Sequence, residues 1–188
     1  MIMLARLWLC GLALLGSPAA SAAGIFIESL SQRTVNELDV VDVDVRFVFS
    51  KDVLEALRSG VPLVFNFEFK VTKARRFLWD ATIVAQTRRY ELARHALADR
   101  YVLTDLITRE RRVYGSIDEA AVELGRLRNI PLGERQDFAS GARYRGHLQI
   151  KLDIESLPAP LRPIAYISPS WRMSSDSYRW NLNSTRSD

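Results

Sequence analysis

The chain has 188 residues, a length typical of one domain. Its 48% hydrophobic and 26% charged residues are ordinary for a globular protein, and they exclude a disordered chain, a collagen-like repeat and a polytopic membrane protein. One cysteine and two histidines exclude a disulfide framework and argue against a histidine-rich metal site, and the formal net charge is +4.

The first 23 residues are typical of a secretory signal peptide. Arg6 supplies a positive charge, and the apolar run that follows, residues 7–16, is too short to span a bilayer. Ala20-Ser21-Ala22 fits the small-x-small rule for cleavage. We therefore expect residues 1–23 to be removed by cleavage after Ala22 or Ala23 and the protein to be exported. An uncleaved anchor would leave the domain in the same compartment.

The lone cysteine, Cys10, lies inside this apolar run, so we expect it to be removed with the peptide. A mature chain without cysteine has no cysteine nucleophile, no thiolate metal site and no redox role. No later apolar stretch approaches the length of a membrane span, so we expect no transmembrane helix in the mature chain.

Two strands and a short helix are predicted in the first half of the mature chain. Apolar and polar side chains alternate over residues 41–49 and again over 63–71, the period of a half-buried strand. Between them, residues 51–59 place their apolar side chains on one helical face. Ser50 is the expected N-cap of this helix, and Gly60 is its expected stop.

A third alternation, over residues 79–85, predicts another strand. The alternation shifts near residues 87–89, which indicates a β-bulge or a turn at that point. A further strand is expected over residues 101–114.

The second half of the chain contains a better marked helix. Ser116 and Glu119 have the spacing of a capping box, and apolar residues continue on one face as far as Leu127. Residues 133–142 are expected to form a loop, and residues 144–154 a long amphipathic strand.

Beyond that strand the sequence changes character. Three prolines between residues 157 and 163 predict a rigid extended segment. The polar residues 181–188 are expected to form a disordered tail.

These elements together predict a mainly β (α+β) fold. We expect one antiparallel β-sandwich-like domain over residues 24–180, with two short helices. Strands follow strands without regular β-α-β alternation, so a parallel doubly wound sheet is not expected.

Positive charge is concentrated in residues 70–112, which contain 11 basic and 5 acidic residues. Such a stretch could bind an anionic partner, although nucleic acid is not expected for an exported protein. The simpler interpretation is that opposite charges pair on the solvent faces of neighbouring strands. The acids in question are Asp39, Asp42 and Asp44, and the bases are Arg75, Arg76, Arg88 and Arg89.

Several short tracts, taken in order, resemble a bacterial family of unknown function, DUF4390. They are residues 54–63, 75–80 and 114–121, then Leu152-Asp153 ahead of Leu157-Pro-Ala-Pro-Leu161, and finally Trp171. The resemblance covers nearly the whole mature chain. It implies an exported proteobacterial protein, and hence a periplasmic location, with no assigned activity. It also places a membrane sensor protein among the candidate partners.

No motif marks a catalytic centre. The sequence contains neither a Gly-x-Ser-x-Gly nucleophile elbow nor a paired-histidine metal motif. Asp80 with Glu91, or Asp153 with Glu155, would serve in glycoside cleavage only if the fold held both carboxyl groups across a cleft. We therefore expect no enzymatic activity, no cofactor and no metal.

The best candidates for a binding site join aromatic surface to positive charge: Arg75, Arg76, Trp79 and Trp171. We expect a non-enzymatic binding or accessory module that engages a protein or envelope component through a sheet face or edge. Residues 63–71 are a candidate edge strand for adding a partner's strand. Two alternatives stay open. One is a carrier that holds an apolar or lipid-like ligand between the sheet and its helices, which would require a hydrophobic cavity between strands 41–49 and 144–154, and the other is an uncharacterised enzyme.

Overall fold

The computed structural model describes residues 23–75, 79–134, 137–138 and 142–182. Its strands, α-helices and 3-10 helices (η) are, in chain order, β1 (Gly24–Val35), β2 (Leu38–Val48), α1 (Lys51–Arg58), β3 (Leu63–Lys73), β4 (Ala81–His95), β5 (Arg100–Asp105), β6 (Arg111–Tyr114), α2 (Ile117–Leu124), β7 (Arg126–Glu134), β8 (Tyr144–Leu152), η2 (Ile154–Ser156), η3 (Ala159–Leu161), α3 (Arg162–Ile167), η4 (Pro169–Trp171) and β9 (Tyr178–Leu182).

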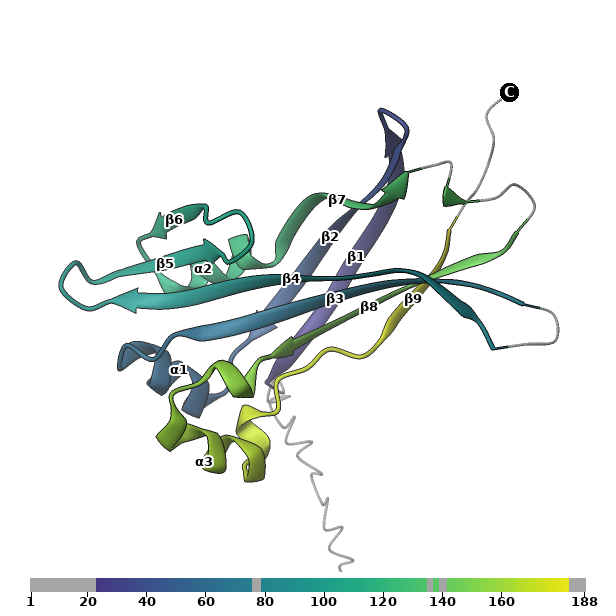
Figure 1. Cartoon of the computed structure of the whole chain (residues 1–188). Helices are drawn as coiled ribbons and strands as arrows, with labels where there is room; N and C mark the ends of the chain where they lie inside the picture. Colours follow the sequence, from purple (N-terminus) through teal and green to yellow (C-terminus); the bar gives the residue numbers. More distant parts are fainter. Residues whose placement is uncertain (1–22, 76–78, 135–136, 139–141, 183–188) are drawn as a thin grey trace, which may run out of the picture.

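The strands form two antiparallel sheets that share one core. The smaller sheet has the strand order β1-β2-β7, and the larger has the order β6-β5-β4-β3-β8-β9. The strands of the smaller sheet cross the larger sheet obliquely, and α1 and α3 lie together at one end of the molecule (Figure 1). The mainly β, antiparallel, sandwich-like fold expected from the sequence is therefore confirmed.

The core is built on β3, whose inward residues Phe65, Phe67 and Phe69 are at most 1% exposed. Val43 of β2, in the other sheet, is also fully buried. The two sheets meet directly, because the ring of Phe47 on β2 lies edge-on to the ring of Phe65 with centroids 5.2 Å apart. The alternation predicted for residues 41–49 and 63–71 thus corresponds to the two facing strands of the core.

The place of β3 in its sheet corrects one expectation. β3 is paired along its length with β4 on one side and with β8 on the other. Its backbone N–H and C=O groups are therefore already bonded, and residues 63–71 cannot accept a partner's strand. The edges of the two sheets are instead β1, β7, β6 and β9.

The prediction of a bulge or turn at residues 87–89 is also wrong, since these residues pair regularly with β3. The register slips instead at Ile83. Val71 and Thr72, which are consecutive on β3, pair with Val84 and Thr82, so Ile83 is skipped. Ile83 is 40% exposed. From Val84 onward, the even-numbered residues of β4 face the smaller sheet, which is the opposite phase to the one expected from residues 79–85.

Both predicted helix caps are present. Ser50 Oγ accepts a hydrogen bond from the backbone N–H of Val53 at the start of α1. Ser116 Oγ accepts from the N–H of Glu119 at 3.2 Å, and the Glu119 carboxylate accepts from Gly115 N at 3.0 Å, one residue before the expected partner. The second helix is shorter than expected, because residues 126–134 turn back as β7 and pair with β2.

The region after β8 differs most from the sequence-based expectations. The strand predicted over residues 144–154 ends at Leu152, where η2 begins after one residue. The segment expected to be extended, residues 157–163, instead forms η3 and the start of α3, so there is a third α-helix. Proline is tolerated in the first turn of a helix because its missing N–H would have no partner there.

Three strands were not predicted. β1 joins β2 through a two-residue turn at Asn36 and Glu37, whose φ angles are 48° and 63°. β7 and β9 complete the two sheets, and β9 includes residues 181 and 182, which were expected to belong to a disordered tail. Residues 183–188 lie outside the described part of the chain.

Gly125 is expected to be intolerant of any side chain. A Cβ added there would lie 2.0 Å from the backbone oxygen of Val45, whose N–H in turn bonds Gly125 O at 2.9 Å. Gly125→Ala should lower the free energy of unfolding by about 3 kcal/mol, measured by urea denaturation, because the α2–β2 contact must open.

The matched control for this change is Gly115→Ala, at the other end of α2. A Cβ at Gly115 meets the flexible end of Arg100 at 3.1 Å, so the cost should stay under about 1 kcal/mol. Equal destabilisation by the two variants would contradict the close approach at Gly125.

Candidate functional site

The inward face of β4 changes from apolar to polar along the strand. Leu92 is fully buried, and the ring of Tyr90 packs edge-on against Phe67 with centroids 5.4 Å apart. Further along the same face lie Arg88 and Gln86, directly opposite Phe67 and Phe69 of β3. Because these long polar side chains replace apolar ones, the two sheets do not close on each other here as they do over β3.

The result is a groove between the sheets with a volume of about 430 Å³, within the range of small-molecule binding sites. One wall comes from β4, β5 and β6, and the other from the end of α2 and from β7. The lining residues are Arg88, Tyr90, Leu103, Asp105, Glu110, Arg112, Glu123, Leu124 and residues 126–130.

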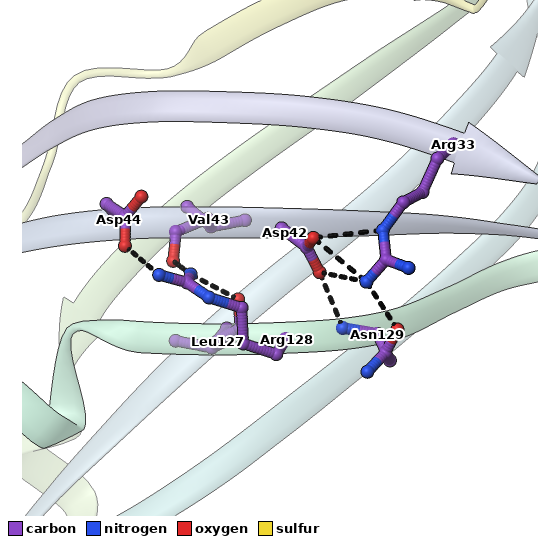
Figure 2. A network of polar contacts seen from close by, with 7 residues as sticks. All are labelled: Arg33, Asp42, Val43, Asp44, Leu127, Arg128 and Asn129. Atoms are coloured by element: carbon purple, nitrogen blue, oxygen red, sulfur yellow. Dashed lines mark hydrogen bonds and ion pairs between the residues drawn. The ribbon is translucent and has the colours of Figure 1, made fainter.

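A polar network holds the β7 wall in place (Figure 2). Asp42 accepts a hydrogen bond from Arg33 Nε at 3.1 Å and another from the backbone N–H of Asn129 at 2.8 Å. Arg33 also donates to Asn129 Oδ1 at 2.6 Å. Asn129 has a φ of 55° and lies where the β2–β7 register slips, so Asp42 and Arg33 fix a strained bulge in the strand that lines the groove.

Arg128 also ties the β7 wall to β2. Its guanidinium donates to the backbone oxygens of Val43 and Leu127, each at 2.9 Å, and pairs with Asp44 (Figure 2). Hydrogen bonds from Arg128 and then Ser29 hold the pKa of Asp44 below its usual value. Arg128 is therefore a structural part of the groove.

Two polar contacts bridge the walls at either end of the groove. Gln86 Nε2 donates to the backbone oxygen of Pro131, which joins β4 to β7. Arg112 of β6 pairs with Glu110 at 2.9 Å and with Glu123 of α2. These contacts set the separation of the two walls.

Arg88 differs from the other arginines between these bridges. Its Nε is buried and has no hydrogen-bond partner among the described residues, and Arg88 is in no ion pair there. Leaving such a group unsatisfied costs free energy. A carboxylate or phosphate entering the groove would satisfy it with charge-assisted hydrogen bonds.

Tyr90 is the inward neighbour of Arg88 on β4 and also lines the groove. Burial, followed by the charge of Asp105, raises the pKa of Tyr90 to about 12. The phenol therefore keeps its proton throughout the physiological pH range and donates it in a hydrogen bond to the carboxylate of Asp105.

The four residues singled out from the sequence are not brought together. Trp79 is 94% exposed in the connection between β3 and β4, and Arg75 is exposed in the same connection. Arg76 lies outside the described residues. Trp171, in contrast, is 5% exposed and belongs to the η4 turn at the opposite end of the larger sheet. Trp79 and Trp171 therefore do not belong to one binding surface.

The expected charge pairing between strands is wrong as well, because the acids of β2 lie in the smaller sheet and the arginines of β4 in the larger. Asp42 and Asp44 pair with arginines of their own sheet. Arg89 pairs with Asp153 at 3.0 Å, and Arg88 faces the groove.

Neither candidate carboxylate pair faces a cleft with both carboxyl groups: one contains a residue bound in a structural network, and the members of the other lie far apart. Asp153 accepts hydrogen bonds from Ser156 at 2.7 Å and from Arg89 at 3.0 Å. Burial would raise the pKa of Asp153, but hydrogen bonds from Ser156, Asn66 and Arg89 lower it overall. Glu155 is exposed and faces Arg162. Asp80 and Glu91 are a strand's length apart, because Asp80 precedes β4 and Glu91 is near its far end.

The cavity expected between residues 41–49 and 144–154 coincides with the packed core. Val41, Val43, Leu148 and Ile150 on these strands are fully buried, and the phenylalanines of β2 and β3 are in ring contact there. The groove described above lies elsewhere, beside β4 and β7. Within the described residues, no cluster of three metal-ligating side chains occurs, and no helix is long and apolar enough to cross a membrane.

Fold and groove together define a small β-sandwich-like domain with an arginine-lined groove between its sheets. The chain belongs to the family described as "Domain of unknown function (DUF4390)", whose model matches residues 22–181. No curated protein and no solved structure matches the chain. The family resemblance expected from the sequence is thus confirmed, and the groove has to be interpreted from its own residues.

From the sequence, Arg88 is expected only as one of several arginines on the solvent faces of the strands. A usable signal was present, because Tyr90 and Leu92 have the apolar phase of the inward face. Extending that phase backward by two and four residues from Tyr90 places Arg88 and Gln86 inside the sandwich.

The buried phenol of Tyr90 should make the protein sensitive to alkali. Its pKa is about 12 in the folded protein against 10.0 as the usual value, so its stabilising contribution is complete below pH 10 and is lost as the pH rises through 12. Because part of the ring is exposed, we expect a loss of only about 1–2 kcal/mol.

The variant Tyr90→Phe tests this expectation. Its free energy of unfolding, measured by denaturation, should decline less steeply between pH 10 and pH 12 than that of the parent. Tyr166→Phe, at an exposed position of α3, should keep the parent slope, and identical slopes for all three proteins would contradict the assignment.

Proposed function

We propose that this protein is an exported, non-enzymatic binding module of the bacterial envelope. It binds an acidic group, a carboxylate or a phosphate carried by a protein or an envelope component, in the groove between its sheets. The observation that carries the proposal is the buried Nε of Arg88, which has no partner within the described residues, whereas the neighbouring Arg112 and Arg128 are each in an ion pair. A guanidinium left in that state is completed by an anionic ligand.

The chemistry of the lining favours binding over catalysis. Arg88 and Arg126 offer positive charge, and Leu103 and Leu124 offer apolar contact. Each carboxylate of the lining already has a partner: Glu110 and Glu123 pair with Arg112, and Asp105 accepts hydrogen bonds from Tyr90 and from the backbone N–H groups of Ile107 and Thr108. This combination suits the binding of an anion better than general-base catalysis.

The edge of β7 is poorly suited to adding a partner's strand. Pro131 has no N–H, its carbonyl is taken by Gln86, and the carbonyl of Leu127 is taken by Arg128. The bulge at Asn129 interrupts the edge further. Proline, bulges and charged side chains are the usual means of protecting an edge. The groove therefore fits a small acidic group or a side chain better than an added β-strand.

Export rests on residues 1–23, whose positive start, short apolar run and small residues match a signal peptide. Expression of the full chain in a proteobacterium should yield, in the periplasmic fraction, a protein whose intact mass corresponds to a start at Ala23 or Gly24. Recovery of the full-length mass from the cytoplasm would overturn the export part of the proposal and leave the groove untouched.

The groove is tested by Arg88→Met, which keeps the length and apolar stem of the side chain and removes its charge. Succinate and inorganic phosphate, titrated into the mature protein, should each shift the NMR signal of the Arg88 Nε–H group, and Arg88→Met should bind neither. The same variant should raise the free energy of unfolding by about 1 kcal/mol, because a buried N–H that has no partner among the described residues is removed.

The matched control is Arg111→Met, an exposed position on β6 that does not line the groove. It should bind both probes as the parent does. Binding by Arg88→Met that equals binding by this control would refute the anion site. A loss of stability in Arg88→Met would show instead that Arg88 has a structural role.

A further inference from the structure

A row of positive charge crosses the outer face of the larger sheet. Lys70 of β3, His147 of β8 and Arg179 of β9 are directly opposite one another in the registers of three adjacent strands. They face away from the smaller sheet, because Lys70 alternates with the buried Phe69 and Val71. Lys70 and Arg179 carry the permanent charges of this row, and His147 of β8 lies between them.

The charge of the row is left largely uncompensated. Lys70 and Arg179 are exposed and in no ion pair within the described residues. Arg145, one step further along β8, is 58% exposed, and Asp80 lies 3.9 Å from it, at the limit of an ion pair. Burial, followed by the charges of Arg179, Lys70 and Arg145, lowers the pKa of His147, as expected in a positive field.

An exposed tryptophan lies at the same end of the sheet. β3 and β4 end their pairing at Lys73 and Ala81, and the connection beyond them carries Arg75 and Trp79. Lys70 is only three residues before the end of β3, about 10 Å along the strand. Trp79 is 94% exposed, which is unusual for so large an aromatic side chain.

We propose that this end of the larger sheet docks on an anionic membrane surface, with Lys70, Arg145 and Arg179 against the lipid phosphates and Trp79 inserted at the headgroup level. Basic residues near such a surface each add to the attraction, and tryptophan prefers the interface because its ring is apolar and its N–H is polar. An acidic protein could also cover the indole, and the vesicle experiment below distinguishes it from a membrane surface. This surface is separate from the Arg88 groove, so either proposal can fail without the other.

The experiment is sedimentation of the mature protein with vesicles. Mixed phosphatidylglycerol–phosphatidylcholine vesicles should bind it at low salt and release it at high salt, and pure phosphatidylcholine vesicles should not bind it. The double variant Lys70→Gln/Arg179→Gln should bind about fivefold more weakly for each charge removed. The control Lys51→Gln/Arg111→Gln has the same net charge, carries its changes away from this end and should bind as the parent does.

Tryptophan fluorescence tests the depth of Trp79 separately. Binding to the mixed vesicles should shift the emission to shorter wavelength and protect it from acrylamide, and Trp79→Phe should lose both effects because Trp171 is buried and Trp180 packs against the core. Equal binding by the two double variants would overturn the proposal. So would binding without any change in the environment of Trp79, or binding to soluble heparin but not to the vesicles.

Discussion

The structure depends on the burial of three phenylalanines on one strand. Phe65, Phe67 and Phe69 lie in the middle of the larger sheet, with β4 and β8 on either side and β2 packed across them. Truncating one such ring typically costs about 3–5 kcal/mol, a large share of the stability of a small domain. Every other element either covers this row or extends the sheet that carries it, so β3 fixes where the second sheet, the helices and the groove can lie.

The groove is the place where this packing is incomplete. Moving outward from β3 to β4, the inward face begins with Tyr90, which still contacts Phe67, and continues to Arg88, whose buried Nε has no hydrogen-bond partner in the described part of the chain. The opposite wall does not relax into the gap, because Asp42, Arg33 and Arg128 hold the bulge of β7 against β2. A polar inner face and a rigid opposite wall together keep open a space that apolar residues would have closed.

The sequence pattern indicates the strands with one buried face and the helices with clear caps, since both depend on neighbouring residues. It fails where the deciding partner is distant. The edge strands β1 and β7 lack clean alternation because one is largely exposed and the other is bulged at Asn129. On β4, alternation alone cannot tell the inner face from the outer, and the extra residue at Ile83 reverses the phase. Arg88 was therefore visible as a charge, whereas its position inside the sandwich follows only from the register with β3.

The pairing of β3 with β8 also determines when the protein can fold. A chain that emerges N-terminus first can form the β1–β2 and β3–β4 hairpins early, because each joins neighbouring segments. Neither sheet can be completed until distant strands are available, since Val41 pairs with Ile130 and Phe65 pairs with Leu152. Until residue 152 is available, the phenylalanine row stays uncovered on one side and is open to association with other chains. Folding is thus delayed until most of the chain has emerged, and a nascent chain that stops short of β8 has the strongest need for a chaperone.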